Sequence, residues 1–151
     1  MTRKGISIYY DRYPIIAVNN QDYDRAKVFS VFHELAHVFR RSSSLCMIDF
    51  DERNDAEEKL CDRIAAETLM PENDFLMIAK SCRNSINEWD LISLEKVGGR
   101  FGVSPVAVLR RLYDLKKISF AEYTSLYETL SNEFDKNRDQ IDQARRKNDF
   151  R

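Results

Sequence analysis

Two histidines and a glutamate in one short segment have the residue types and spacing of a metal-dependent hydrolytic site. His33 and His37 are four residues apart, so on a helix they lie one turn apart on the same face, where both imidazoles can bind one ion. Glu34 follows the first histidine and is placed to hold a water and accept its proton. A bound metal lowers the pKa of such a water to about 7. The pattern therefore predicts a metal-binding helix that activates water.

The segment that carries these residues, 26–40, is apolar nearly all round, which is typical of a buried helix. Ionisable groups that are buried without partners cost several kcal/mol, so His33, Glu34 and His37 would each need one. The alternative interpretation is a polar pair in the core that is hydrogen-bonded internally and binds no metal. That alternative has to explain both histidines and the glutamate together, which a metal site does directly.

A catalytic zinc needs a third protein ligand, with its fourth position left for water. The chain has only 2 histidines, and positions 40 and 43 are Arg and Ser, which excludes the longer metzincin pattern that ends in a third histidine. The third ligand must therefore be a carboxylate or a cysteine. A second predicted helix, 56–70, offers four carboxylates: Glu57, Glu58, Asp62 and Glu67.

Helical geometry chooses among these carboxylates. At about 100° per residue, the apolar arc of the second helix consists of Leu60, Cys61, Ile64, Ala65 and Leu69. Glu67 falls on the opposite side and is expected to be solvated, whereas Glu57 and Glu58 both lie within the arc. Only Glu58 has a carboxylate one turn further on, Asp62, which can accept a hydrogen bond from a ligating histidine. We expect Glu58 to be the third ligand, with Glu57 as the alternative, and Asp62 to orient a histidine. The alternative role for Asp62 is a surface ion pair with Lys59 or Arg63.

The elements that would position this site follow from local signals. Two strands are predicted at 6–9 and 15–19, and Asp22 or Asp24 can cap the metal-binding helix. Asp55 is a plausible cap for the second helix, and Pro71 ends it. A third helix is predicted over 72–80 and a further one over 118–130, and the chain from 132 onward is a charged helix or tail.

Residues 90–113 have the pattern of a helix-turn-helix. Gly102 suits the turn, Ser104 caps the following helix and Pro105 occupies its first position. The segment is locally basic, through Lys96, Arg100, Arg110, Arg111, Lys116 and Lys117. Three roles fit this pattern: a helical pair that only packs on the core, a docking surface for a protein substrate, and direct DNA binding. The DNA-binding role is disfavoured because the second helix has few polar residues where bases would be read.

Composition limits the remaining function classes. The formal net charge is −1, so the chain as a whole has no electrostatic attraction to nucleic acid or membranes. No apolar run approaches the roughly 20 residues of a membrane span, and no signal peptide is evident. The three cysteines Cys46, Cys61 and Cys82 are widely spaced, as expected of reduced thiols in a cytoplasmic protein; an inhibitory thiolate on the metal is the alternative for Cys46.

Three segments resemble the ImmA/IrrE family of metallopeptidases, in the family's order along the chain: 15–19 (IIAVN), 26–37 (AKVFSVFHELAH) and 58–71 (EKLCDRIAAETLMP). The resemblance implies a zincin-like α+β core, metal ligation by His33, His37 and Glu58, and a catalytic base at Glu34. The Asp62 position is commonly Asn in that family, so aspartate there departs from the family's usual residue. The family also implies cleavage of phage-repressor-like DNA-binding regulators.

Together these observations predict a mostly helical α+β protein with a zincin-like core at 1–82, a helix-turn-helix-like segment at 83–131 and a charged helix or tail at 132–151. The predicted function is a zinc-dependent endopeptidase that cleaves a repressor-like regulator, with Mn²⁺ or Fe²⁺ as alternative metals. The rival is a helix-turn-helix transcriptional or antitoxin-like regulator with a vestigial metal site. Strand 15–19 is expected to pair with the substrate, and Tyr9, Tyr10 and Tyr13 are candidate oxyanion donors. The chain's ends are compatible with a piece of a longer protein.

Overall fold

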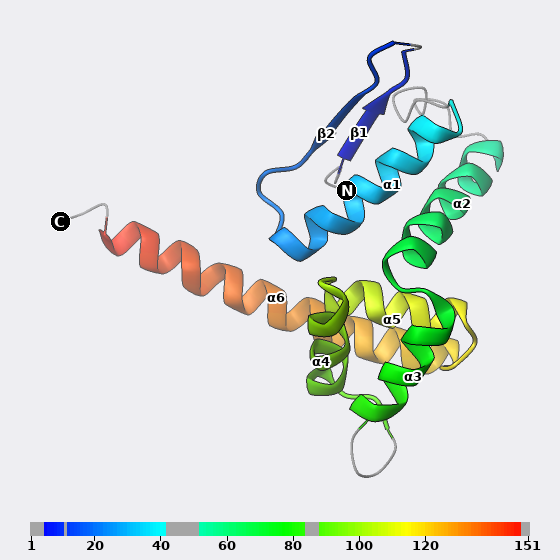
Figure 1. The fold of residues 1–151 in the computed structure, drawn as a ribbon. Helices are drawn as coiled ribbons and strands as arrows, with labels where there is room; N and C mark the ends of the chain where they lie inside the picture. The colour runs from blue at the N-terminus through cyan, green and yellow to red at the C-terminus, as the bar shows by residue number, and fades with distance from the viewer. Residues whose placement is uncertain (1–4, 11, 42–51, 84–87, 149–151) are drawn as a thin grey trace.

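The computed structural model describes residues 5–10, 12–41, 52–83 and 88–148. Over these residues the chain is mostly helical with one small antiparallel sheet, which confirms the α+β prediction (Figure 1). The elements are β1 (Gly5–Ile8), β2 (Ile15–Val18), α1 (Asp24–Phe39), α2 (Glu52–Leu69), α3 (Glu72–Cys82), α4 (Leu91–Phe101), α5 (Pro105–Asp114) and α6 (Phe120–Asn148). None of the helices in these ranges is long and apolar enough to cross a membrane.

The N-terminal elements form a layered unit around α1. Strands β1 and β2 pair in antiparallel register, with Gly5 opposite Val18 and Ile8 opposite Ile15. Both strands contact α1, and α1 also contacts α2. Figure 1 shows α1 between the small sheet and α2. This arrangement brings the segment that carries the two histidines against the helix that carries the candidate third ligand.

The expectation that the metal-binding helix is buried all round was wrong. The buried residues of α1 are Ser30, Glu34, Ala36 and His37. Phe39 is 80% exposed and Val28 and Val31 are 37% and 38% exposed. The sheet and α2 cover only part of the helix surface, and the part they cover is the one with most of the polar groups. The buried face of α1 is therefore the face that carries the chemistry.

The C-terminal elements build the main apolar core. Its fully buried members include Met70, Phe75, Leu94, Val97, Val103, Val108, Leu109 and Leu112. Gly102 ends α4 in the left-handed region with φ 69°, which glycine adopts without steric cost. Ser104 accepts a hydrogen bond from the backbone N–H of Ala107, and Pro105 opens α5. The predicted turn at Gly102 and the predicted start of the next helix at Ser104 and Pro105 are thus confirmed.

Several predicted helix ends differ from the observed ones. Tyr23 is the N-cap of α1 and makes no side-chain cap hydrogen bond, so neither Asp22 nor Asp24 caps it. Helix α2 begins at Glu52, which places Asp55 inside the helix; acidic residues in a first turn are favoured by the helix dipole and need not be caps. Helix α6 is continuous to Asn148 and crosses the change in composition at 132. Pro71 does separate α2 from α3, as predicted.

A buried arginine ties α5 to α2. Arg111 is buried, and its guanidinium donates to the carboxylate of Glu67, which the sequence had placed in solvent. The hydrogen bond from Arg111 holds the pKa of Glu67 below its usual value. The side chain of Glu67 is 56% exposed, so solvent weakens this pair, but the loss of Glu67 leaves a buried cation without its partner.

We expect Glu67→Ala to destabilise the protein by about 1 kcal/mol at pH 7 in urea unfolding, a value discounted for exposure. Because the folded-state pKa of Glu67 is lowered, the contribution is present above its unfolded pKa of about 4.3 and is lost as the pH falls through the lower folded value. The matched control is Glu95→Ala, which removes an ion pair with the half-exposed Arg25 and should cost only a few tenths of a kcal/mol. Equal costs for the two variants at pH 7 would contradict the buried-cation argument.

Candidate metal centre

Helices α1 and α2 bring three potential ligands to one point. His33 and His37 come from α1 and Glu58 comes from α2. The Nε2 atoms of the two histidines are 3.3 Å apart, His33 Nε2 lies 3.2 Å from Glu58 Oε2, and His37 Nε2 lies 3.0 Å from Glu58 Oε1. His37 is fully buried, while the side chain of Glu58 is 35% exposed. The cluster is therefore closed to solvent at His37 and partly exposed at Glu58.

These distances fit a shared metal ion. Ligand atoms bound at 2.0–2.1 Å to a tetrahedral zinc lie about 3.3 Å from one another, and the three spacings are close to that value. Glu58 Oε1 is also buried without a hydrogen bond from any described residue, although His37 Nε2 is 3.0 Å away. Buried acceptors normally have hydrogen bonds, so this orphaned oxygen calls for another partner. A cation between the three side chains would supply it.

Asp62 lies behind the first histidine. Its Oδ1 is 2.8 Å from His33 Nδ1, the ring nitrogen that faces away from the cluster. Burial lowers the pKa of His33, but the hydrogen bond and charge of Asp62, together with the charges of Glu58 and Glu34, outweigh burial and raise it overall. A carboxylate on Nδ1 leaves Nε2 with its lone pair free for a metal. Asp62 therefore contacts the ring nitrogen through which a carboxylate could orient His33.

Removing this support should weaken metal binding without abolishing it. We expect Asp62→Ala to lower zinc affinity about 10–100-fold, because His33 loses the group that fixes its tautomer and ring orientation. Asp62→Asn should lower it less, since the amide oxygen can still accept from Nδ1. Competition with a fluorescent zinc chelator measures both values. Unchanged affinity in Asp62→Ala would show that the contact is a surface ion pair only.

Glu34 is buried beside the cluster. It is 4% exposed, and its Oε2 has no hydrogen-bond partner among the described residues. The carboxylate lies against the first residue of β1, so it is enclosed between the sheet and α1. If these side chains hold a metal, an enclosed carboxylate beside them would be placed to accept a proton from a water there.

The alternative third ligand, Glu57, is engaged elsewhere. Its two carboxylate oxygens accept from Arg40 Nε and Nη2 at 2.6 and 2.8 Å, a bidentate pair. Glu57 also belongs to a second possible ligand group with His37 and Cys61. Burial, followed by the negative charges of Glu57 and Glu58, raises the pKa of the Cys61 thiol to about 12, so it is protonated at neutral pH. Both observations favour Glu58 over Glu57 as the third ligand.

The cysteines Cys61 and Cys82 form no disulfide, whereas Cys46 lies outside the described residues.

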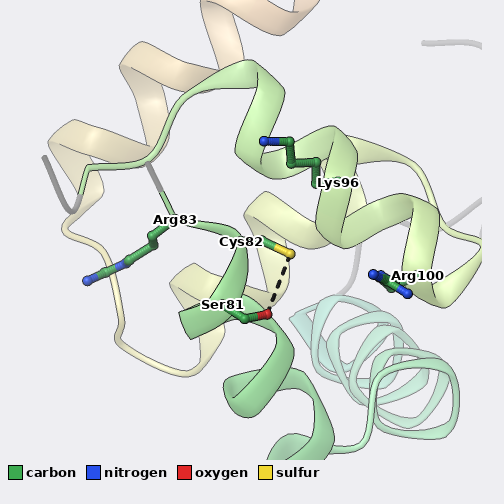
Figure 2. Close-up of a pocket in the computed structure, with 5 residues that line it drawn as sticks. All are labelled: Ser81, Cys82, Arg83, Lys96 and Arg100. Atoms are coloured by element: carbon green, nitrogen blue, oxygen red, sulfur yellow. Dashed lines mark hydrogen bonds between the residues drawn. The ribbon is translucent and has the colours of Figure 1, made fainter. Parts of the chain in front are cut away.

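The helix-turn-helix presents few free side chains for reading bases. Within α5 only Arg110 and Asp114 are exposed, and Arg110 Nε donates to Asp114 at 3.0 Å. Lys96 and Arg100 on α4, with Ser81, Cys82 and Arg83, instead line a cavity of about 580 Å³. Figure 2 shows Arg83 directed away from the other two cations, so the three do not converge on one point. No residue of the metal centre lines this cavity.

Two of the three tyrosines proposed as oxyanion donors are largely exposed. Tyr10 and Tyr13 follow β1 and precede β2, and they are 60% and 80% exposed. Tyr9 is only partly buried. The structure therefore singles out none of the three as a donor to a reacting carbonyl.

Comparison with known proteins agrees with this geometry. The family profile of the IrrE N-terminal-like domain, a peptidase family, matches residues 2–113, which is most of the chain. No curated protein and no solved structure gives a significant match. The chain therefore belongs to the ImmA/IrrE family of metallopeptidases. Membership makes it a peptidase, which acts on a protein substrate, and the match covers β1 to α5.

Proposed function

We propose that this chain is a zinc-dependent endopeptidase with His33, His37 and Glu58 as metal ligands and Glu34 as the catalytic base. The observation that carries the proposal is the convergence of the three ligand side chains, whose donor atoms lie within 4.8 Å of one another. Glu34 is buried next to them, and one of its oxygens has no hydrogen-bond partner in the part of the chain that the structure describes, which supports the hydrolytic role. The two-histidine, one-carboxylate donor set suits zinc and leaves a fourth position free; manganese and iron accept the same donors.

A bound zinc would lower the pKa of a water and polarise the scissile carbonyl. The residues of this chain would transfer the proton, orient the ligand His33 and exclude water. Glu34 would accept the proton of the attacking water and pass it to the leaving amine, since its buried carboxylate is one residue from His33 and its charge acts on that ring. Asp62 would keep the His33 ring in one orientation through the 2.8 Å contact at Nδ1. Burial of His37 and Glu34 would exclude bulk water from that side of the site.

The substrate we propose is a repressor-like DNA-binding regulator, as the family implies. An extended segment of it would add to the small sheet along the predicted strand, observed as Ile15–Val18. The described sheet has only two strands, so each has one edge that the other does not fill. Main-chain hydrogen bonds along such an edge give affinity for many sequences, and pockets for side chains give selectivity.

The rival function, a DNA-binding regulator with a vestigial metal site, receives less support. The exposed positions of α5 are an arginine and an aspartate paired with each other, and Arg111 is buried against Glu67. A recognition helix needs several side chains free to reach base edges. The donor atoms of His33, His37 and Glu58, in contrast, lie close enough together to hold one ion.

Mapping of new protein N-termini tests the proposed function. Extract from cells that encode this protein is treated with the purified, zinc-loaded chain, and the new N-termini are identified by mass spectrometry. We expect a small set of cleavage sites, concentrated in a DNA-binding regulator, that disappear with a zinc chelator and with Glu34→Gln. An identical set of termini with wild type and Glu34→Gln would overturn the proposal.

A further inference from the structure

The catalytic glutamate packs against a residue that has no side chain. Gly5 is the first residue of β1. A Cβ added to Gly5 would lie 2.8 Å from Glu34 Oε1, 2.9 Å from Glu34 Cγ and 3.2 Å from Glu34 Cδ. Carbon atoms in contact normally stay about 3.5–4.0 Å apart. Any other residue at position 5 would therefore force Glu34 or the strand to move.

Gly5 is not required by the backbone conformation. Among the described glycines only Gly102 has a φ in the left-handed region. Glycine in a strand weakens it, and one common reason for its presence is the close approach of another group. The approaching group here is the side chain of Glu34. A Cβ at position 5 would be too close to it at Cγ, at Cδ and at the carboxylate oxygen Oε1. A contact that begins at Cγ cannot be relieved by rotating the carboxylate alone.

We propose that Gly5 is a positioning residue, which sets the place of the Glu34 carboxylate by leaving room for it between β1 and α1. The inference rests on the proposed function, because it assigns Gly5 a role through the catalytic base. Glu34 is 4% exposed and one residue from the ligand His33, so it has little free space on its other sides. Added bulk at position 5 would shift the carboxylate relative to the metal centre. A misplacement of about 1 Å in a catalytic group can cost 10²-fold in rate.

Two other glycines provide matched controls. A Cβ at Gly98 would lie 2.7 Å from the backbone oxygen of Val103, so Gly98→Ala should strain the turn after α4 far from the ligands. A Cβ at Gly99 would meet only Arg25 Nη2, at 3.9 Å, so Gly99→Ala should be tolerated. The first control loses stability without touching Glu34, and the second adds a methyl group without a clash.

The kinetic test uses zinc-loaded protein and a peptide that spans a cleavage site found by N-terminal mapping. We expect Gly5→Ala to lower kcat about 100-fold with little change in KM or in zinc affinity. In a Glu34→Asp background, whose shorter side chain withdraws from position 5, the same substitution should lower kcat less than about threefold. Gly98→Ala and Gly99→Ala should leave kcat per folded molecule unchanged. Full activity of Gly5→Ala, or the same loss in both backgrounds, would overturn the inference.

A second cycle needs no substrate. Thermal unfolding of the zinc-loaded protein should show Gly5→Ala lowering the midpoint by roughly 3–10 °C when Glu34 is present. In a Glu34→Ala background the midpoint should stay the same or rise, since alanine restricts the unfolded chain. A wild-type chain that cleaves nothing would overturn the proposed function, and this cycle would still decide whether Gly5 sets the position of Glu34. Equal shifts in both backgrounds would show that it does not.

Discussion

Glu34→Gln is expected to lower peptide cleavage about 10²–10⁴-fold while zinc still binds with wild-type affinity. Glutamine keeps the size of the side chain and its fit against β1, but it cannot accept the proton of the attacking water. Glu34 is not among the three converging ligands, so the metal centre should remain intact. The measurement pairs single-turnover cleavage of the mapped peptide with metal analysis of the same sample.

The control for Glu34→Gln is a measurement of whether the variant is as stable as the wild type. Thermal unfolding with zinc bound should give a midpoint close to that of the wild type, because Glu34 Oε2 has no hydrogen-bond partner to lose among the described residues. Cleavage at the wild-type rate by Glu34→Gln would remove Glu34 from the mechanism. Loss of zinc together with activity would instead give Glu34 a role in binding the metal.

Glu58→Ala is expected to lower zinc affinity by more than about 100-fold, beyond the loss expected for a residue that only supports a ligand. The variant keeps both histidines but loses the only ligand of the set that comes from α2. Zinc stabilises the folded protein in proportion to its occupancy, by about 2.7 kcal/mol at 100 times Kd. The rise in unfolding midpoint that zinc gives the wild type should therefore largely disappear.

Glu57→Ala is the matched control for this prediction. Glu57 precedes Glu58 on the same helix and has the same charge, but its carboxylate is held by Arg40. We expect Glu57→Ala to keep zinc affinity within a few-fold of the wild type. A larger loss in Glu57→Ala than in Glu58→Ala would identify the other ligand group, with His37 and Cys61, as the metal site.

The arrangement of the ligand side chains could be predicted because it depends on local geometry. The i, i+4 spacing of His33 and His37 fixes their common face, and the helical period separates Glu58 from Glu67. The turn at Gly102 and the cap at Ser104 are likewise set within a few residues. Local rules of this kind hold whenever the element forms.

Features that depend on tertiary packing were not predictable in the same way. A helix that is apolar all round does not reveal which face its neighbours cover, and here they cover Ser30, Glu34 and His37 rather than Phe39. The contact between Gly5 and Glu34 joins residues far apart in sequence, and so does the Arg111–Glu67 pair. Neither leaves a periodic signal. For the contact between Gly5 and Glu34, the one clue in the sequence is a glycine at the start of a strand.

A crystal structure of the zinc-loaded protein, with anomalous data on both sides of the zinc absorption edge, tests the central claim most directly. The account predicts one strong peak bound to His33 Nε2, His37 Nε2 and the Glu58 carboxylate, with Glu34 next to it but not ligating. The absence of a peak at these residues under zinc-replete conditions, or a peak held by His37, Glu57 and Cys61 instead, would contradict it.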